Sequence, residues 1–167
     1  WFNKYYSEGI EKILSLRIKD LDSELREKVK ILSAKYQLST IDTEVNKVVQ
    51  DIQRLEIKND DIILIPYNIE NKHWVGMVFK KVNEGFEVVY FNPENKEVEL
   101  RLLSDLEREL KIIGQKLSFH QELVEEQQYN NCGAEVIENF IYYITGKRIE
   151  GDKAVIYHSY LVETELI

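Results

Sequence analysis

The spacing of apolar residues changes near residue 57, and this change limits the possible folds more than any other feature of the sequence. Before it, residues 7–55 carry apolar side chains three or four positions apart, which is typical of helices packed on one face. After it come three short apolar runs, at residues 62–66, 73–80 and 86–91, with an Asn-Glu-Gly turn between the last two. These runs predict a strand followed by a hairpin, apolar on both faces and therefore central in a sheet.

The rest of the chain alternates between helix and strand. Residues 97–113 have an amphipathic pattern that predicts a helix, and residues 115–123 alternate as a strand would. A helix is predicted from about residue 132 to residue 145, with Gly146 ending it. The tail at 154–166 is interpreted as a last helix, with a strand as the alternative. This order of elements is that of an α+β domain.

The length of 167 residues suits one domain with a substantial core. We expect a single domain over residues 1–167, divided into a helical part (1–57), a core (58–146) and a C-terminal segment (147–167). The chain begins at Trp1 rather than at a methionine, so we expect it to be a fragment of a longer protein.

Composition excludes several classes of protein. The net charge of -8 argues against a nucleic-acid binder, because neutralising phosphates requires clustered lysine and arginine. An acidic surface favours a basic partner, or is simply a solvated face. No apolar run approaches the roughly 20 residues that a membrane span needs. The single cysteine excludes an internal disulfide and fits a reducing compartment.

That cysteine, Cys132, stands between a polar loop and the start of a predicted helix. A helix N-terminus lowers the pKa of a thiol, and the glycine that follows lets backbone N–H groups approach a substrate carbonyl. A lone cysteine can equally be a small buried core residue. The apolar positions of this helix would bury one side of it against the sheet: Val136, Ile137, Phe140, Ile141 and Ile144.

A base for such a thiol is available at His73, which opens the second apolar run, while Asn92 closes the third. In a hairpin with a two-residue turn, the numbering places both side chains on one face of the sheet. A turn at residues 82–83 would bring them together, whereas a turn at 84–85 would leave them about 13 Å apart. An asparagine can orient an imidazole in a Cys-His-Asn site. Structural or exposed positions are expected for the other histidines, His120 and His158.

Three motifs in this order resemble the clan CE cysteine proteases: HWVGMVF (73–79), VVYFNP (88–93) and QQYNNCGAEVI (127–137). That superfamily includes SUMO-specific proteases, adenovirus-type proteases and many bacterial effector deubiquitinases. The resemblance covers residues 62–146. It implies a papain-like fold, in which a small, mostly antiparallel central sheet packs against helices and the nucleophile lies at a helix N-terminus.

The resemblance also implies roles for individual residues. Cys132 would be the nucleophile, His73 the general base, Asn92 the residue that orients it and Gln127 the oxyanion donor. No metal or cofactor is implied. Two further positions, Trp74 and Gly133, would bind substrate. The tryptophan would wall a narrow channel for the Gly-Gly tail of a modifier protein, or be a core aromatic at the sheet edge.

Two departures from the family pattern leave alternatives open. The family usually has an acidic residue where this chain has Asn92, and an amide can orient the ring without stabilising the imidazolium by charge. Glu94 and Asn95 are alternative orienting residues. The family glutamine usually precedes the cysteine by six residues, whereas Gln127 and Gln128 precede it by five and four. Gln127 is the preferred candidate.

We therefore expect one catalytic domain, a thiol isopeptidase that removes ubiquitin or a ubiquitin-like modifier through a thioester intermediate. Its partners would be the modifier and modified host proteins, after secretion by an intracellular bacterium into the host cytosol. One alternative is a clan CE-type acetyltransferase, although no Lys/Arg cluster is visible that would bind coenzyme A. Another is a weakly active ubiquitin-binding module with residues 40–55 as its docking helix, or as a helix that only packs on the core.

Overall fold

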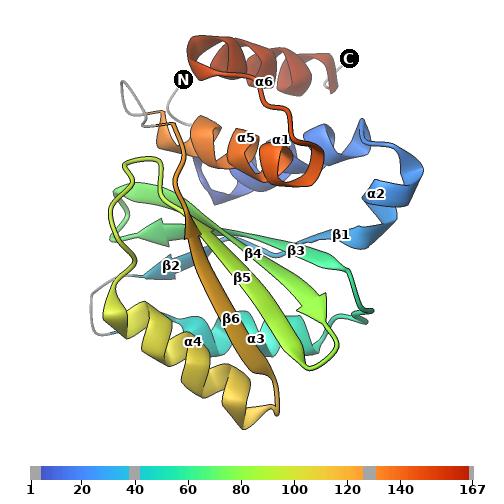
Figure 1. Cartoon of the computed structure of the whole chain (residues 1–167). Coiled ribbons are helices and arrows are strands. Elements are labelled where there is room, and N and C mark those ends of the chain that lie inside the picture. Colours follow the sequence, from blue (N-terminus) through green and yellow to red (C-terminus); the bar gives the residue numbers. More distant parts are fainter. Residues whose placement is uncertain (1–4, 38–41, 126–130, 166–167) are drawn as a thin grey trace.

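A mixed β-sheet lies between two layers of helices in the computed structural model, which describes residues 5–37, 42–125 and 131–165 (Figure 1). The helices are α1 (Ser7–Lys19), α2 (Ser23–Lys28), α3 (Val45–Gln53), α4 (Leu100–Ile112), α5 (Cys132–Thr145) and α6 (Gly151–Glu165). The strands are β1 (Val29–Ile31), β2 (Lys35–Gln37), β3 (Ile62–Ile69), β4 (His73–Val82), β5 (Gly85–Phe91) and β6 (Lys116–Glu122). None of the helices in these ranges combines the length and hydropathy that crossing a membrane requires.

The sheet has the strand order β1-β3-β4-β5-β6, and β2 also pairs with β3. Its centre, β3-β4-β5, is antiparallel, whereas β1 and β2 pair with β3 in parallel and β6 pairs with β5 in parallel. The predicted strand and hairpin are therefore confirmed as the centre of the sheet. The predicted helices after β5 and at the cysteine are confirmed as well, and the tail forms a helix rather than a strand.

The prediction that residues 7–55 are helical throughout is wrong at β1 and β2. The apolar spacing of Leu25, Val29 and Leu32 fits a helix, yet α2 ends at Lys28 and the chain continues in extended conformation. Residues 29–31 then pair with the edge of β3, which offers a row of unpaired backbone groups. Such pairing overrides a weak helical preference in a short segment.

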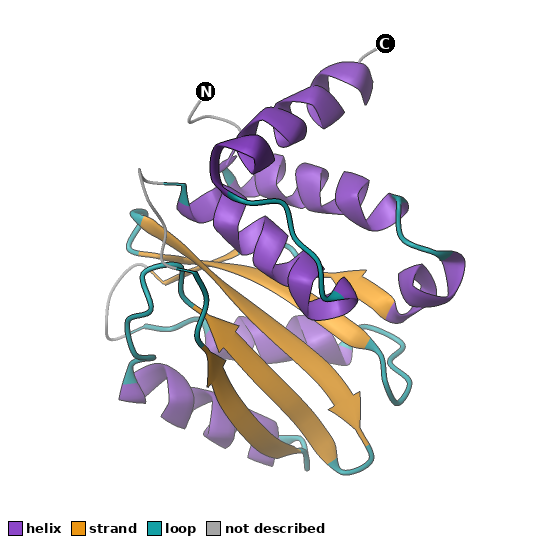
Figure 2. Cartoon of the chain, turned by 45° about the horizontal axis from the view of Figure 1, so that its top comes forward, coloured by secondary structure: helices purple, strands orange, loops and turns teal. Residues whose placement is uncertain are grey.

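Apolar side chains fill both faces of the sheet, as predicted for its central strands. One core lies between the sheet and the layer of α3 and α4, and the other lies between the sheet and the layer of α1 and α5 (Figure 2). Gly76 on β4 allows the second layer to come close, because a Cβ there would lie 3.0 Å from the ring of Phe140 on α5. Helix α5, which begins at Cys132, therefore packs closely against β4.

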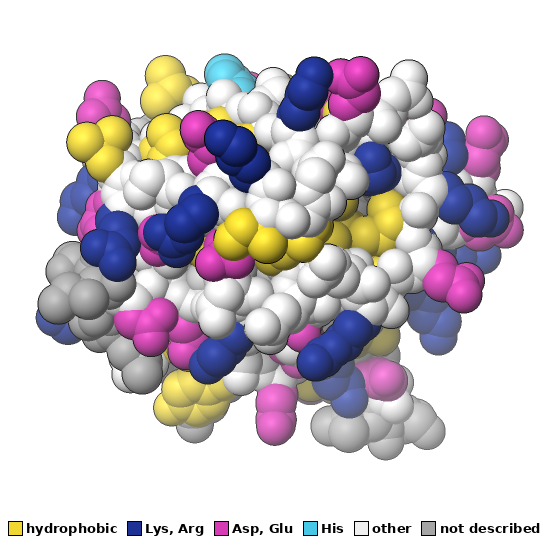
Figure 3. All heavy atoms as spheres, turned by 90° about the horizontal axis from the view of Figure 1, so that it is seen from below, with side chains coloured by type: hydrophobic (Ala, Val, Ile, Leu, Met, Phe, Trp, Pro, Cys, Tyr) yellow, Lys and Arg dark blue, Asp and Glu magenta, His cyan; other side chains and the backbone are white. Residues whose placement is uncertain are grey.

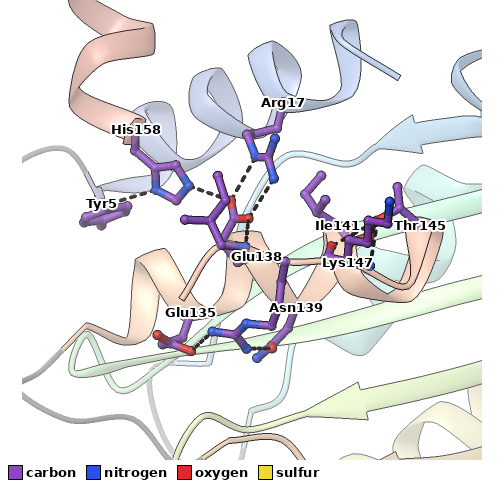
Figure 4. A network of polar contacts seen from close by, with 11 residues as sticks. Tyr5, Arg17, Glu135, Glu138, Asn139, Ile141, Thr145, Lys147 and His158 are labelled. Carbon is purple, nitrogen blue, oxygen red and sulfur yellow. Dashed lines mark hydrogen bonds and ion pairs between the residues drawn. The ribbon is translucent and has the colours of Figure 1, made fainter. Parts of the chain in front are cut away.

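A buried polar network fastens α5 to α1 and α6 (Figure 4). Glu138, which is fully buried, accepts hydrogen bonds from Arg17 at 2.7 and 2.9 Å, from His158 Nε2 at 2.7 Å and from the N–H of Ile149 at 3.1 Å. Tyr5 extends the network through a 2.9 Å contact between its hydroxyl and His158 Nδ1. Burial raises the pKa of Glu138, but the hydrogen bonds from His158 and Arg17 lower it to about 2.

We expect Glu138→Gln to lower the free energy of unfolding by about 3 kcal/mol at neutral pH, because Arg17 loses its buried counter-charge. The folded pKa of Glu138 lies below its ordinary value, so its contribution is present above pH 4.5 and is lost as the pH falls toward about 2. Urea unfolding across this pH range should show the two proteins converging at low pH. The exposed Glu163→Gln is the control, and equal loss of stability in both variants would contradict the prediction.

Candidate active site

Cys132 is the first residue of α5 and opens into a cavity of about 530 Å³. The cavity brings it together with three other predicted site residues, His73, Trp74 and Gly133. The remaining residues of the lining are Tyr5, Tyr6, Tyr36, Asn68, Asn71, Lys72 and Glu94. The predicted oxyanion donor Gln127 lies outside the described residues.

The β4–β5 hairpin positions His73 and Asn92. Its turn lies at residues 83–84, since Val82 pairs with Gly85. This turn lies between the two turns that the sequence allowed. In the resulting register, His73 and Asn92 are two positions away from lying directly opposite each other. The pairing of β4 with β5 ends before either residue is reached, so their side chains are free to meet. His73 Nε2 lies 2.7 Å from Asn92 Oδ1, which confirms that the two are close.

The hydrogen bonds of Asn92 determine which nitrogen of His73 carries a proton. Asn92 Oδ1 also accepts the backbone N–H of Glu94 at 2.9 Å, and a backbone N–H can only donate. The amide of Asn92 makes a further hydrogen bond to Tyr90, and the side chain is buried. Because an oxygen faces Nε2, that nitrogen must carry the hydrogen. The neutral ring therefore keeps its basic lone pair on Nδ1.

The thiol of Cys132 is harder to ionise than the sequence suggested. Burial raises the pKa of Cys132, and the negative charge of Glu94 adds to this effect. Backbone hydrogen bonds from Trp74 and Gly133 act in the opposite direction but do not outweigh burial. The prediction that the helix N-terminus would lower the thiol pKa is therefore wrong in its net direction. The contact with the backbone of Trp74 places the sulfur beside the start of β4, the strand that His73 opens.

The two predicted substrate-binding residues also have packing roles. Trp74 is only 6% exposed and makes an edge contact with Tyr36, with ring centroids 5.7 Å apart. It packs in the core at the sheet edge and also lines the cavity, while its role toward substrate stays a prediction. Gly133 lies against Tyr5, where a Cβ would come within 2.5 Å of that side chain. A glycine is therefore needed here for the approach of Tyr5.

Of the two alternative orienting residues, only Glu94 reaches His73. Its Oε1 lies 3.4 Å from Nδ1, on the opposite side of the ring from Asn92. Asn95 is engaged elsewhere, since its side chain donates to the carbonyl of Val124 and accepts the N–H of the same residue. Asn95 therefore holds the loop after β6 and does not touch the imidazole in the described contacts.

Sequence reasoning missed some of the cavity lining. Asn68 lies opposite Trp74 on β3, and its buried Oδ1 has no partner among the described residues. A polar residue in an otherwise apolar strand was the available signal for Asn68. Tyr5 gave no such signal, because its position depends on His158 near the other end of the chain. Across the described ranges, His, Cys, Asp and Glu side chains form no group of three that could hold a metal ion.

Known structures with the same architecture include two kinds of protein. The Rickettsia bellii effector RickCE superposes with a TM-score of 0.66 at 14% identity, covering 96% of this chain and 94% of that one. The SUMO protease Ulp1, with its catalytic cysteine oxidised to a sulfinic acid, gives a TM-score of 0.62 at 15% identity, covering 91% of this chain and 72% of that one.

The Ulp1 protease domain in complex with Smt3, the yeast ortholog of SUMO, gives a TM-score of 0.62 at 14% identity, with the same coverage of 91% and 72%. No family model and no curated protein sequence matches the chain. The likeness therefore lies in the three-dimensional arrangement, which here includes a sheet between helix layers and a cysteine at the start of α5. The chain has the fold of the clan CE cysteine proteases.

Proposed function

We propose that residues 1–167 form one catalytic domain, a thiol isopeptidase that cleaves ubiquitin or a ubiquitin-like modifier after its C-terminal Gly-Gly. The observation that carries this proposal is the shared cavity of Cys132 and His73, with Asn92 hydrogen-bonded to Nε2 of the ring. The fold likeness to Ulp1, seen in complex with Smt3, supports a ubiquitin-like modifier as the substrate class.

In this mechanism the sulfur of Cys132 attacks the carbonyl carbon after Gly-Gly, and its proton passes to Nδ1 of His73. Backbone N–H groups at the start of α5 would stabilise the oxyanion, together with the side chain of Gln127. The carbon–nitrogen bond then breaks as His73 gives its proton to the leaving lysine amine, which leaves a thioester. Water hydrolyses the thioester with His73 as base, and the cysteine is regenerated.

The shape of the cavity supports an extended tail without side chains. Trp74 is buried under Tyr36, and Tyr5 closes against Gly133, so bulky walls surround the sulfur. Glycine residues fit where backbone must pass close to such walls. The net charge of -8 would further favour a modifier that presents a basic face.

The fold likeness to RickCE, an effector of Rickettsia bellii, supports a similar setting for this chain. We propose that it acts on modified host proteins after secretion by an intracellular bacterium into the host cytosol, a reducing compartment.

The structure favours this function over the two alternatives. On the face over α3 and α4, Lys/Arg and Asp/Glu side chains are interspersed among apolar ones (Figure 3). The described lining of the cavity combines one lysine, Lys72, with the carboxylate of Glu94, whereas the anionic coenzyme A would favour a more basic site. For the ubiquitin-binding module, residues 40–55 were a possible docking helix. Instead, α3 buries its apolar side chains in the core: Val45, Val48, Val49 and Ile52.

The proposal is tested by incubating the protein with a panel of modifiers that carry a C-terminal electrophile. We expect one of them to form a covalent adduct at Cys132, found by intact mass and peptide mapping. A small thiol reagent applied in parallel shows that the sulfur is accessible. If that reagent reacts with Cys132 but neither ubiquitin nor any ubiquitin-like modifier of the panel forms an adduct, the proposed substrate class is wrong.

We expect Asn92→Ala to lower kcat/KM by about 10- to 100-fold, because the ring of His73 loses one orienting hydrogen bond while the nucleophile remains. Asn92→Asp should retain activity within about tenfold of wild type, since a carboxylate can still accept from Nε2 and adds charge to the imidazolium. A fluorogenic modifier substrate measures both variants, with folding checked by circular dichroism. A folded Asn92→Ala protein as fast as wild type would remove this residue from the site.

A further inference from the structure

The carboxylate of Glu94 faces the nitrogen of His73 that the thiol needs. Asn92 occupies Nε2 at 2.7 Å, so Nδ1 is the ring nitrogen left to accept the proton of Cys132. Glu94 Oε1 lies 3.4 Å from this same Nδ1. A hydrogen bond from Lys96 lowers the pKa of Glu94, so the carboxylate is charged at neutral pH. In the proposed mechanism, Glu94 and Cys132 would therefore use the same ring nitrogen.

The charge of Glu94 has opposite effects on the two reacting groups. A neutral ring would present the lone pair of Nδ1 to the carboxylate, whereas a protonated ring donates its Nδ1–H to it. The contact between Glu94 and Nδ1 is therefore an ion pair only when the ring is protonated. The same negative charge opposes a second negative charge on the sulfur of Cys132, whose pKa is already raised by burial.

The position of this carboxylate differs from the one that the resemblance implies. An acidic residue at position 92 would lie at Nε2, away from the nitrogen that the proposed mechanism assigns to the thiol proton, and would stabilise the imidazolium from there. In this chain position 92 is an amide, and the negative charge is two residues further on, at Nδ1. The charge therefore lies at the ring nitrogen that the proposed mechanism assigns to the thiol proton.

We propose that Glu94 holds the site in a resting state, in which its carboxylate pairs with a protonated His73 while Cys132 keeps its thiol proton. This inference rests on the proposed function, in which His73 and Cys132 are the reacting pair. To enter the active state, Glu94 turns away, the Nδ1–H bond of His73 breaks and its proton leaves to solvent, so that Nδ1 can accept the proton of Cys132. No electrons are exchanged with another reactant.

Lys96 offers the displaced carboxylate a second partner. Its Nζ lies 2.8 Å from Oε2 of Glu94, and its side chain is 74% exposed. The carboxylate can therefore turn toward Lys96 and solvent without becoming unpaired. Glu94 is a positioning residue in this scheme, because it acts on substrate only through His73 and Cys132.

Other charged or titratable groups also face the pair from the described elements around the cavity. Besides Lys96, the cavity is lined by the lysine that precedes β4 and by three tyrosines, two from the segment before α1 and one from β2. These groups are Lys72, Tyr5, Tyr6 and Tyr36. Glu94 is thus the carboxylate whose removal should change the ionisation of the site most.

The test measures how fast iodoacetamide alkylates the protein as a function of pH. The chain has one cysteine, so the rate reports on Cys132 alone, as its thiolate forms a sulfur–carbon bond and releases iodide. We expect Glu94→Gln to lower the midpoint of this profile by about one pH unit. The acidic and basic limbs of the pH profile of kcat/KM should shift to lower pH in the same variant. Lys96→Gln should raise the midpoint by a smaller amount.

Glu97→Gln is the matched control, because it removes an exposed carboxylate from the same loop. Its midpoint should equal that of wild type. An unchanged midpoint in Glu94→Gln, or an equal shift in Glu97→Gln, would overturn the resting pair. If Glu94→Gln does not fold, the test is the midpoint pH of Lys96→Gln, and a midpoint no higher than that of wild type would overturn the proposal. A shifted alkylation profile in a protein that cleaves no modifier would support the resting pair and overturn the proposed function.

Discussion

Replacing Cys132 by alanine is expected to abolish turnover, with a loss in kcat/KM of at least about 10⁴-fold. The sulfur is the atom that forms the thioester, and neither a backbone N–H nor His73 can substitute for it. Alanine favours helices, and Cys132 is the first residue of α5, so the fold should be retained. Hydrolysis of a fluorogenic modifier substrate measures the loss.

Binding provides the control for this variant. Cys132→Ala should still bind the modifier with nearly the affinity of wild type, as measured by calorimetry, because the walls of the cavity are unchanged. The same variant should form no adduct with an electrophilic modifier. Cleavage at the wild-type rate in a folded Cys132→Ala protein would show that the nucleophile lies elsewhere and would end the cysteine protease proposal.

The second large effect is expected for His73→Gln, which should lower kcat/KM by about 10³-fold. A glutamine amide can still hydrogen-bond Asn92 Oδ1, so the local packing should survive. It has no basic lone pair near neutral pH, so it can neither accept the thiol proton nor protonate the leaving amine. The slow alkylation of Cys132 in this variant, compared with wild type at the same pH, would trace the loss to the thiol.

His120→Gln is the matched control, since this histidine lies on β6 with a side chain that is 68% exposed. Its activity should equal that of wild type. His158→Gln is unsuitable, because His158 is fully buried between Tyr5 and Glu138 and its loss should weaken the fold. If His120→Gln were the inactive variant and His73→Gln the active one, the assignment of the base would be wrong.

The sequence predicted the central sheet and the cysteine helix because both depend on local patterns. Strands β3, β4 and β5 are apolar on both faces, and such runs can be stable only between two layers of helices. The stripe on α5 repeats at helical spacing, and Gly146 adopts the left-handed conformation that ends the helix. The alternation of side chains along a strand also predicted that His73 and Asn92 lie on the same face of the sheet.

The environment of the thiol could not be predicted from the sequence, because desolvation depends on what packs around a residue. The helix N-terminus is a local feature that lowers a thiol pKa, yet the walls around Cys132 raise it. Those walls include Tyr5, which lies more than a hundred residues away in sequence and is held in place by His158. No spacing rule connects such residues.

The sequence by itself therefore determined the order of elements, the central hairpin and the candidates Cys132, His73 and Asn92, since periodicity and strand parity are properties of neighbouring residues. Only the tertiary structure decided that residues 29–31 would be a strand, because the free edge of β3 supplied their hydrogen bonds. It also decided that Glu94 would reach Nδ1 of His73, because the exact turn of the hairpin sets which side chains meet beyond the ends of its strands.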